Sequence, residues 1–143
     1  LDVNSEGLLL LTTDGKVSEY VRGRKVEKEY YVQVDGYIKQ EEINRLIKGV
    51  EIGFDGKKYI TKTCKSSLIS APFFKDRTQK IRDDRHGPTS WISITLTEGK
   101  FRQVRKMTAA VGFPTLRLIR VRIDTIMLEG LKLGEVKEVV RFF

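Results

Sequence analysis

Short apolar runs separated by turn signals recur along the chain, a pattern that favours strands. Four consecutive leucines, Leu8–Leu11, follow Gly7 and are followed by the turn pair Asp14-Gly15. A run of this length is too short for a free-standing helix and is typical of a buried strand. We therefore expect a strand near the amino end, with the acids Asp2 and Glu6 flanking its start.

Several later segments also have strand character. Apolar residues at Tyr30, Val32 and Val34 alternate with polar ones, which predicts a half-buried strand. Asp55-Gly56 is a plausible hairpin turn, and the second hairpin strand is expected over Tyr59–Ser70. Further strands are expected in 91–97, in 114–124 and near the carboxyl end.

Three segments predict short helices, over residues 16–23, 40–48 and 100–112. The second has Ile43, Leu46 and Ile47 at helical spacing and ends at Gly49. The third ends at Gly112, with Pro114 beyond it. Helical geometry places its basic residues on one side and its apolar residues on the other: Arg102, Arg105 and Lys106 against Val104, Met107 and Val111.

These elements predict an α+β fold, a mixed and mainly antiparallel sheet with a few short helices. Hairpin turns and irregular strand–helix alternation argue against a doubly wound fold. A length of 143 residues suits a single domain with its own core, here residues 1–143. Because the chain begins with Leu1 rather than Met, we expect it to be a fragment lacking upstream residues.

The composition restricts the kinds of partner and of site that the chain can have. The formal net charge of +8 makes the chain a candidate polyanion binder, since neutralised phosphates release counterions. The excess is concentrated in 16–28, 75–86 and 100–122, although net charge could also serve solubility alone. A single cysteine and a single histidine exclude an internal disulfide and a Cys/His zinc cluster. No apolar run reaches the roughly 20 residues that span a bilayer, and no secretory signal is visible, so we expect a cytoplasmic protein with no membrane partner.

A charged loop without clear periodicity occupies residues 72–90. It could grip RNA or simply be solvated, because its acidic residues dilute the basic ones. His86 beside Gly87 is interpreted as an exposed loop histidine with no catalytic role.

Three motifs, in order, resemble those of one enzyme family. They are LDVNSEGLLLLTTDG at 1–15, KEYYVQVDG at 28–36 and EGKFRQVRKMTAAVGFPTLRLIRVRID at 98–124. Together they resemble the RsuA/RluB/E/F group of ribosomal RNA pseudouridine synthases, and residues 88–120 are particularly similar to a member acting on the large-subunit RNA. The chain lacks the Gly-Arg that normally precedes Leu-Asp, and Phe101 and Arg102 occupy positions that vary in the group.

The resemblance implies a reaction and a set of residues. A uridine in RNA is isomerised to pseudouridine without metal or organic cofactor, and a carboxylate works at the sugar. Asp2 matches the catalytic aspartate, Arg105 the basic residue that pairs with it, and Tyr30 the tyrosine that lies against the target base. Leu118 matches a leucine that packs on the base. From pattern alone, a core position explains Tyr30 nearly as well, and Leu118 is a core residue by default, so that only the resemblance gives it a role. Glu6 matches no catalytic position.

The implied partner is a structured stem-loop of ribosomal RNA, from which the target base is flipped out. We assign contacts with that RNA to Arg22, Arg24, Lys25, Arg82, Arg85 and Arg102. The protein is expected to act as a monomer. A non-catalytic basic RNA-binding domain is the alternative, and the sequence does not identify the modified uridine.

Overall fold

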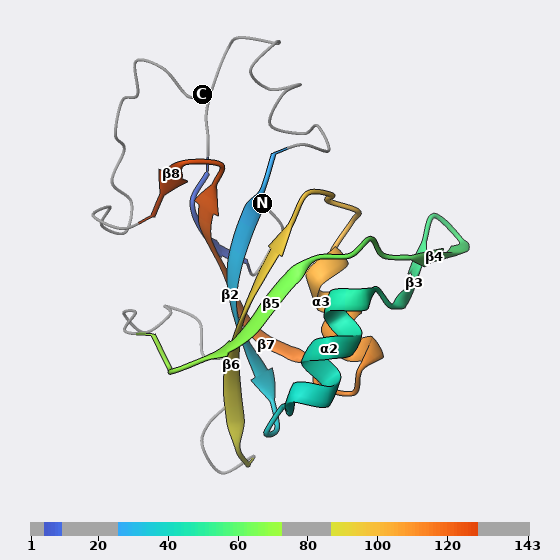
Figure 1. Cartoon of the computed structure of the whole chain (residues 1–143), viewed down its shortest axis with the longest axis horizontal. Coiled ribbons are helices and arrows are strands. Elements are labelled where there is room, and N and C mark those ends of the chain that lie inside the picture. Colours follow the sequence, from blue (N-terminus) through green and yellow to red (C-terminus); the bar gives the residue numbers. More distant parts are fainter. Residues whose placement is uncertain (1–4, 10–25, 73–86, 129–143) are drawn as a thin grey trace, which may run out of the picture.

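The computed structural model describes residues 5–9, 26–72 and 87–128 (Figure 1). In chain order its elements are β1 (Glu6–Gly7), β2 (Lys28–Asp35), α2 (Gln40–Lys48), β3 (Glu51–Phe54), β4 (Lys57–Ile60), β5 (Lys65–Ile69), β6 (Thr89–Leu96), α3 (Gln103–Ala110), β7 (Thr115–Ile123) and β8 (Ile126–Met127). The helix expected over 16–23, most of the 72–90 loop and the chain beyond residue 128 lie outside the described residues.

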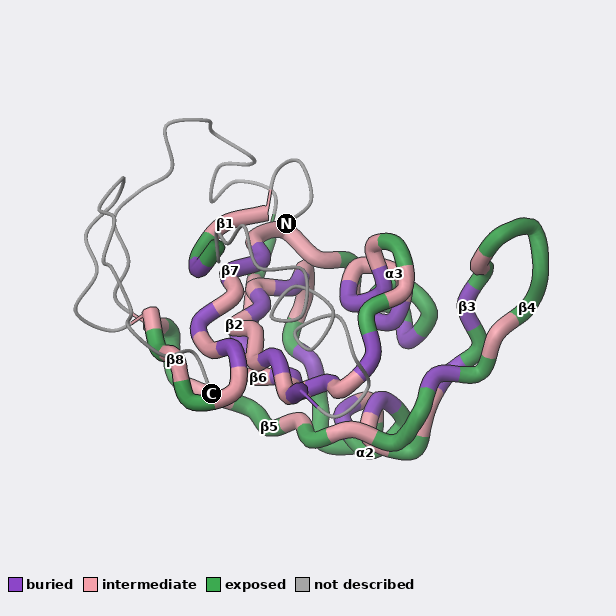
Figure 2. Tube along the Cα trace, turned by 90° about the horizontal axis from the view of Figure 1, so that it is seen from above, coloured by how far each residue is buried: buried purple, intermediate pink, exposed green. Residues whose placement is uncertain are grey.

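A mixed sheet forms the centre of the fold. Its strand order is β1-β7-β2-β6-β5, and β8 also pairs with β7. The β1–β7 pair is parallel, whereas β2, β5, β6, β7 and β8 pair in antiparallel fashion. Buried stretches run along β2, β6 and β7 (Figure 2). The predicted α+β class with a mixed, mainly antiparallel sheet is therefore confirmed.

The start of the leucine run differs from the prediction. The strand comprises Glu6 and Gly7, ahead of the leucines. Leu8 is buried as expected, but Leu9 is exposed. Leu8 packs with Val26 and Ile123 in a small core of its own.

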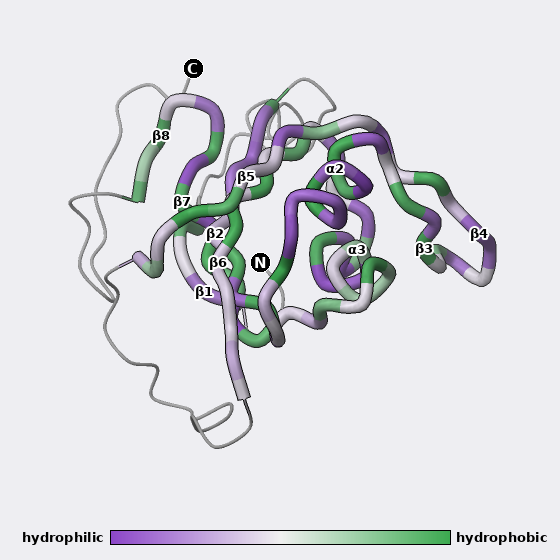
Figure 3. Tube along the Cα trace, turned by 60° about the horizontal axis from the view of Figure 1, so that its bottom comes forward, coloured by the Kyte–Doolittle hydropathy of each residue, from purple (hydrophilic) through white to green (hydrophobic). Residues whose placement is uncertain are grey.

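A separate two-stranded hairpin, β3–β4, projects from the sheet, and its tip is hydrophilic (Figure 3). The Asp55-Gly56 turn is confirmed. A single strand over Tyr59–Ser70 is wrong, because residues 61–64 turn away to bond the end of α2. Thr61 N donates to Val50 O at 2.9 Å, and Cys64 N donates to Ile47 O at 3.0 Å. The chain thus leaves the hairpin as β4 and enters the main sheet as β5.

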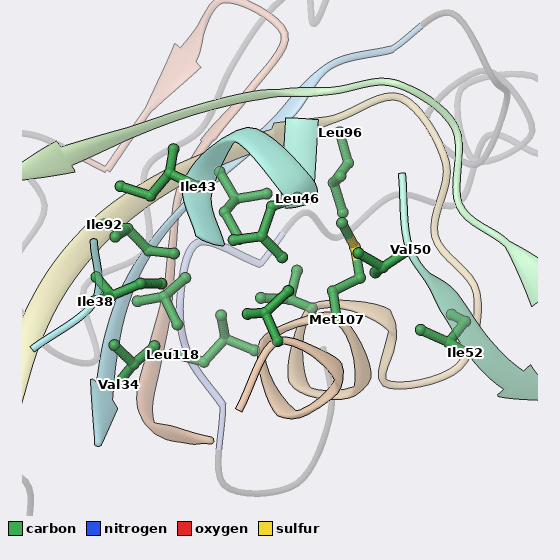
Figure 4. Close-up of a cluster of buried hydrophobic side chains, with 14 residues drawn as sticks. Val34, Ile38, Ile43, Leu46, Val50, Ile52, Ile92, Leu96, Met107 and Leu118 are labelled. Atoms are coloured by element: carbon green, nitrogen blue, oxygen red, sulfur yellow. The ribbon is translucent and has the colours of Figure 1, made fainter. Parts of the chain in front are cut away.

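Both described helices lie on the same face of the sheet (Figure 1). Ile43 and Leu46 of α2, Met107 of α3, and Ile92 and Leu118 of the sheet converge in one core (Figure 4). The helices predicted over 40–48 and 100–112 are confirmed, the second with the shorter bounds Gln103–Ala110, and both have their apolar sides in this core. We refer to this side of the sheet as the helix face.

The opposite face carries a smaller core. Trp91, Ile119 and Val121 are buried there, and Tyr31 and Ile69 pack against them. Strand alternation accounts for the separation, since neighbouring residues point to opposite faces. No helix among the described residues is long and apolar enough to cross a membrane.

The helix-face core predicts a contrast between two leucines. Leu46 is fully buried and Leu68 is 57% exposed. Leu46→Ala should lower the free energy of unfolding by about 2–5 kcal/mol because it leaves a cavity. Leu68→Ala should change it by less than about 0.5 kcal/mol. Urea denaturation of the two variants measures the difference, and equal losses would contradict the described core.

Candidate active site

Residues 5–8 are held against β7 by arginine side chains. Arg105 Nη2 on α3 donates to Ser5 Oγ at 3.3 Å, across a hundred positions of sequence. Arg120 Nε on β7 donates to Leu8 O at 2.9 Å, and Leu8 N donates to Arg120 O at 2.8 Å. The segment that follows Asp2 in sequence is therefore fixed to two distant elements.

Glu6 is held from the other side of the sheet. Arg117 donates to it in a fork, with Nε to Oε2 at 2.8 Å and Nη2 to Oε1 at 2.9 Å. Such two-point pairs are among the stronger polar contacts. Glu6 pairs in register with Ile119, which lies in the opposite-face core. Glu6 thus anchors β1 and points away from Arg105 and Ser5.

Gly7 allows the close approach of β1 to β7. Its φ is +104°, and a Cβ atom added there would collide with the backbone carbonyl of Arg120. Both the backbone conformation and the space exclude a larger residue. A glycine is therefore needed at this position of the amino-terminal motif, because no other residue lets β1 approach β7 so closely.

Tyr30 lies on the helix face, close to this docked segment. It pairs in register with Arg120, which in turn pairs with Gly7 of β1. Tyr30 packs against the helix-face core, whereas Tyr31 packs against the opposite core. The two neighbouring tyrosines therefore point to opposite faces of the sheet.

Positive charge gathers around Tyr30. Lys28 shares its face of β2 and is only 7% exposed. Burial, followed by the proximity of the Arg120 guanidinium, lowers the pKa of the Lys28 ammonium. With Arg105 on α3, these cations give the helix face an environment suited to a carboxylate or a polyanion.

The position of Arg105 depends on how α3 begins. Arg102, just before the helix, adopts a left-handed conformation with φ of 53°. Gln103 then bonds back to the preceding turn: its side-chain oxygen accepts from Lys100 N at 3.0 Å and its Nε2 donates to Glu98 Oε2 at 2.9 Å. The start of α3 is thereby fixed to the end of β6.

Glu98 also ties α3 to the projecting hairpin. Its carboxylate accepts from the Tyr59 hydroxyl and from Lys62 N, the latter at 2.8 Å. Burial by itself raises the pKa of Glu98, but the hydrogen bonds from Tyr59, Lys62 and Gln103 outweigh it, so the pKa lies below its ordinary value of 4.5. The carboxylate is therefore ionised at neutral pH and joins three elements.

The predicted site residues fall into two groups. Tyr30, Arg105, Leu118 and Arg102 are described, and the first three lie on the helix face. Leu118 is buried in the core, and Arg102 is half-exposed at the start of α3. The others lie outside the described residues: Asp2, Arg22, Arg24, Lys25, Arg82 and Arg85.

Sequence reasoning missed Lys28, Arg117 and Arg120. Alternation could have placed Lys28 beside Tyr30, because residues two apart share a strand face. The roles of the two arginines require the parallel register of β1 on β7, which no local pattern indicates. Within 5–9, 26–72 and 87–128, no three His, Cys, Asp or Glu side chains are grouped to hold a metal ion.

Comparison with known proteins gives consistent similarities. A family model described as RNA pseudouridylate synthase matches residues 1–110. The chain is 42% identical over 141 residues to ribosomal large subunit pseudouridine synthase E of Vibrio parahaemolyticus, covering 97% of this chain and 58% of that protein. It is 40% identical over 137 residues to ribosomal large subunit pseudouridine synthase B of Yersinia pestis, covering 94% of this chain and 37% of that protein.

A solved structure is also similar. A crystal structure of a pseudouridylate synthase matches with a TM-score of 0.70 and 32% identity, covering 94% of this chain and 51% of that one. The chain thus spans little more than half the length of the Vibrio protein and of this structure.

Docking of β1 predicts a specific effect of Gly7→Ala. The added methyl group and the positive φ should cost roughly 1–3 kcal/mol of stability and separate Leu8 from Arg120. Hydrogen exchange of the Leu8 amide should accelerate more than that of Val32 in β2. Gly53→Ala, where the added Cβ meets open space, is the control and should leave Leu8 exchange unchanged. Unaltered Leu8 protection in Gly7→Ala would contradict the close approach.

The Glu98 network predicts a pH-dependent stability. The pKa of Glu98 is lower in the folded protein than its ordinary value of 4.5. The stability that the ionised carboxylate contributes is therefore complete above pH 4.5 and is lost as the pH falls through the folded-state pKa. At pH 7, Glu98→Gln should lower the free energy of unfolding by about 1–3 kcal/mol. The difference in this free energy between the variant and the wild type should become smaller towards pH 3. Chemical denaturation between pH 7 and pH 3 measures this difference. The control is Glu51→Gln, at an exposed position, which should leave the free energy of unfolding at neutral pH nearly unchanged. A gap that widens in acid would overturn the assignment.

Proposed function

The chain belongs to the RNA pseudouridylate synthase family, and on that premise we propose that it converts a uridine of large-subunit ribosomal RNA to pseudouridine. The names of the Vibrio and Yersinia relatives support this choice of RNA, since both act on the large ribosomal subunit by name. Residues 1–143 serve as the catalytic domain, acting as a monomer. The cations around Tyr30 suit a polyanionic substrate.

The reaction needs few groups. The bond between ribose C1′ and base N1 breaks, the base turns, and C1′ bonds to C5. The C5 proton then leaves and N1 gains one, so the atoms of substrate and product are the same. Asp2 acts at the sugar, either by attack on C1′ or by removal of the C2′ proton. A carboxylate suits both roles, because positive charge develops on the sugar as the glycosidic bond breaks.

Tyr30 and Arg105 complete the proposed site. The Arg105 guanidinium keeps the Asp2 carboxylate ionised and aims it, as a neighbouring cation does. The Tyr30 ring lies against the target base, and its hydroxyl takes part in the late removal of the C5 proton. Leu118 supports the base from the core side.

One observation carries the proposal: Arg105 bonds Ser5 on the sheet face that also bears Tyr30. Ser5 is three residues from Asp2, and three residues span at most about 11 Å of extended chain. The three family residues, dispersed over a hundred positions of sequence, are thus compatible with one site. Glu6, the neighbouring acid, is instead bound to Arg117 on the other side of the sheet.

The substrate base must leave its stack to reach these groups, and we propose a stem-loop as the substrate. Base flipping exposes the sugar of the target nucleotide. Arg22, Arg24, Lys25, Arg82, Arg85 and Arg102 hold the backbone around it. Recognition of an unstacked loop is the common mode of sequence-specific RNA binding.

The decisive variant is Asp2→Asn. It should abolish pseudouridine formation on unmodified, in vitro transcribed large-subunit RNA, because the amide can neither attack nor remove a proton. Affinity for that RNA should stay within a few fold. Carbodiimide modification and primer extension detect the product, and filter binding measures the affinity.

Asp55→Asn, in the exposed hairpin turn, is the matched control and should keep full activity. Turnover retained by Asp2→Asn would refute the role of Asp2. RNA binding by the wild-type chain without any product would favour the non-catalytic RNA-binding alternative.

A further inference from the structure

Phe101 is an exposed aromatic residue at the start of α3. Its side chain is 66% exposed. Lys106 Nζ lies over its ring, 5.4 Å from the centroid. Single exposed apolar residues are normal on protein surfaces. Phe101 differs from such residues because the Lys106 ammonium lies over its ring and because a second lysine–aromatic group is next to it.

A second lysine–aromatic group involves Lys100, the residue before Phe101. Lys100 Nζ is 5.0 Å from the ring centroid of Phe54 and 5.2 Å from that of Tyr59. The two rings meet edge to face, with centroids 6.3 Å apart. The bond of Tyr59 to Glu98 fixes this group to the end of β6. We call Phe54, Tyr59, Lys100, Phe101 and Lys106 the aromatic–lysine strip.

The strip adjoins the candidate active site. Phe101 lies two residues before α3, and Arg105 is the third residue of that helix. It follows the end of β6, where Leu96 pairs with Lys28 of β2. The strip therefore runs from the start of α3, the helix that carries Arg105, onto the β3–β4 hairpin, which contacts α3 and in which Lys57 and Lys58 are exposed.

We propose that the aromatic–lysine strip binds RNA next to the target uridine, with an unpaired base stacked on Phe101. The inference rests on the proposed function and adds a binding surface to it. Lys100 and Lys106 contact the phosphates on either side of the stacked base. Aromatic rings interleaved with cations form the usual surface for single-stranded nucleic acid, because every base has a face that can stack.

The charge of the strip favours RNA over a protein partner. Its apolar groups are aromatic rings, each with a lysine ammonium over it, and Arg102 lies within the same turn. A protein interface usually has an apolar centre depleted of charge. Flipping the target base also leaves neighbouring bases unstacked, and these need a new surface.

The first test measures binding and turnover of Phe101→Ala on the transcribed large-subunit RNA. We expect a roughly five- to hundredfold weaker affinity, from the usual contribution of one stacked base. The melting temperature should remain that of the wild type, since the ring is exposed. The control is Tyr37→Ala: Tyr37 is 70% exposed, follows the other end of β2, and should not affect affinity.

The second test reports stacking directly. In Phe101→Trp, RNA should quench the emission of the new indole, while in Tyr37→Trp it should not. Trp91, which is buried in the opposite-face core, supplies a common background. Quenching of the first variant alone supports stacking at position 101. Equal affinity in Phe101→Ala, or no quenching in Phe101→Trp, overturns the inference.

The two proposals fail separately. If the wild type forms pseudouridine but Phe101→Ala binds RNA normally, the strip is not the binding surface and the enzyme assignment stands. If Phe101→Trp is quenched while no product forms, the strip binds RNA and the proposed catalysis falls.

Discussion

The docking of residues 5–8 on β7 is the contact on which the candidate site depends. It joins the amino-terminal motif to α3 and β7, which follow about a hundred residues later in the chain. The paired strand is only two residues long, so its backbone ladder is small. Arginine side chains supply further bonds: Arg105 to Ser5, Arg117 to Glu6 and Arg120 to Leu8. The absence of a side chain at Gly7 lets the two backbones meet.

The same contact orders the charges of the site. Arg117 faces one side of the sheet and is neutralised by Glu6, whereas Arg120 and Lys28 lie on the side of Tyr30. Burying Lys28 disfavours its charged form, as the lowered pKa records. A partner carrying negative charge would relieve that cost. The distribution therefore places an arginine paired with an acid on one face and the cations beside Tyr30 on the other.

Local periodicity was enough to predict much of this architecture. The alternation at Tyr30, Val32 and Val34 identified β2, and the spacing in 40–48 and 100–112 identified α2 and α3. The motifs predicted Tyr30 and Arg105 as site residues, and that role stays a prediction. What local pattern could not predict were non-local events: the parallel pairing of β1, the break at 61–64 and the Arg117–Glu6 fork. Each depends on which distant segment lies alongside, a tertiary choice that propensity does not encode.

The break at 61–64 has a consequence for thiol chemistry. Cys64, the chain's one cysteine, turns inward there and its Sγ donates to Leu46 O at 3.3 Å. Burial, with the negative charge of Glu98, raises the pKa of this thiol to about 11. At neutral pH the thiolate is scarce, so the native sulfur is a poor nucleophile towards oxidants and alkylating reagents. A cysteine introduced on the exposed hairpin would therefore take up maleimide dyes selectively, without removal of the native one.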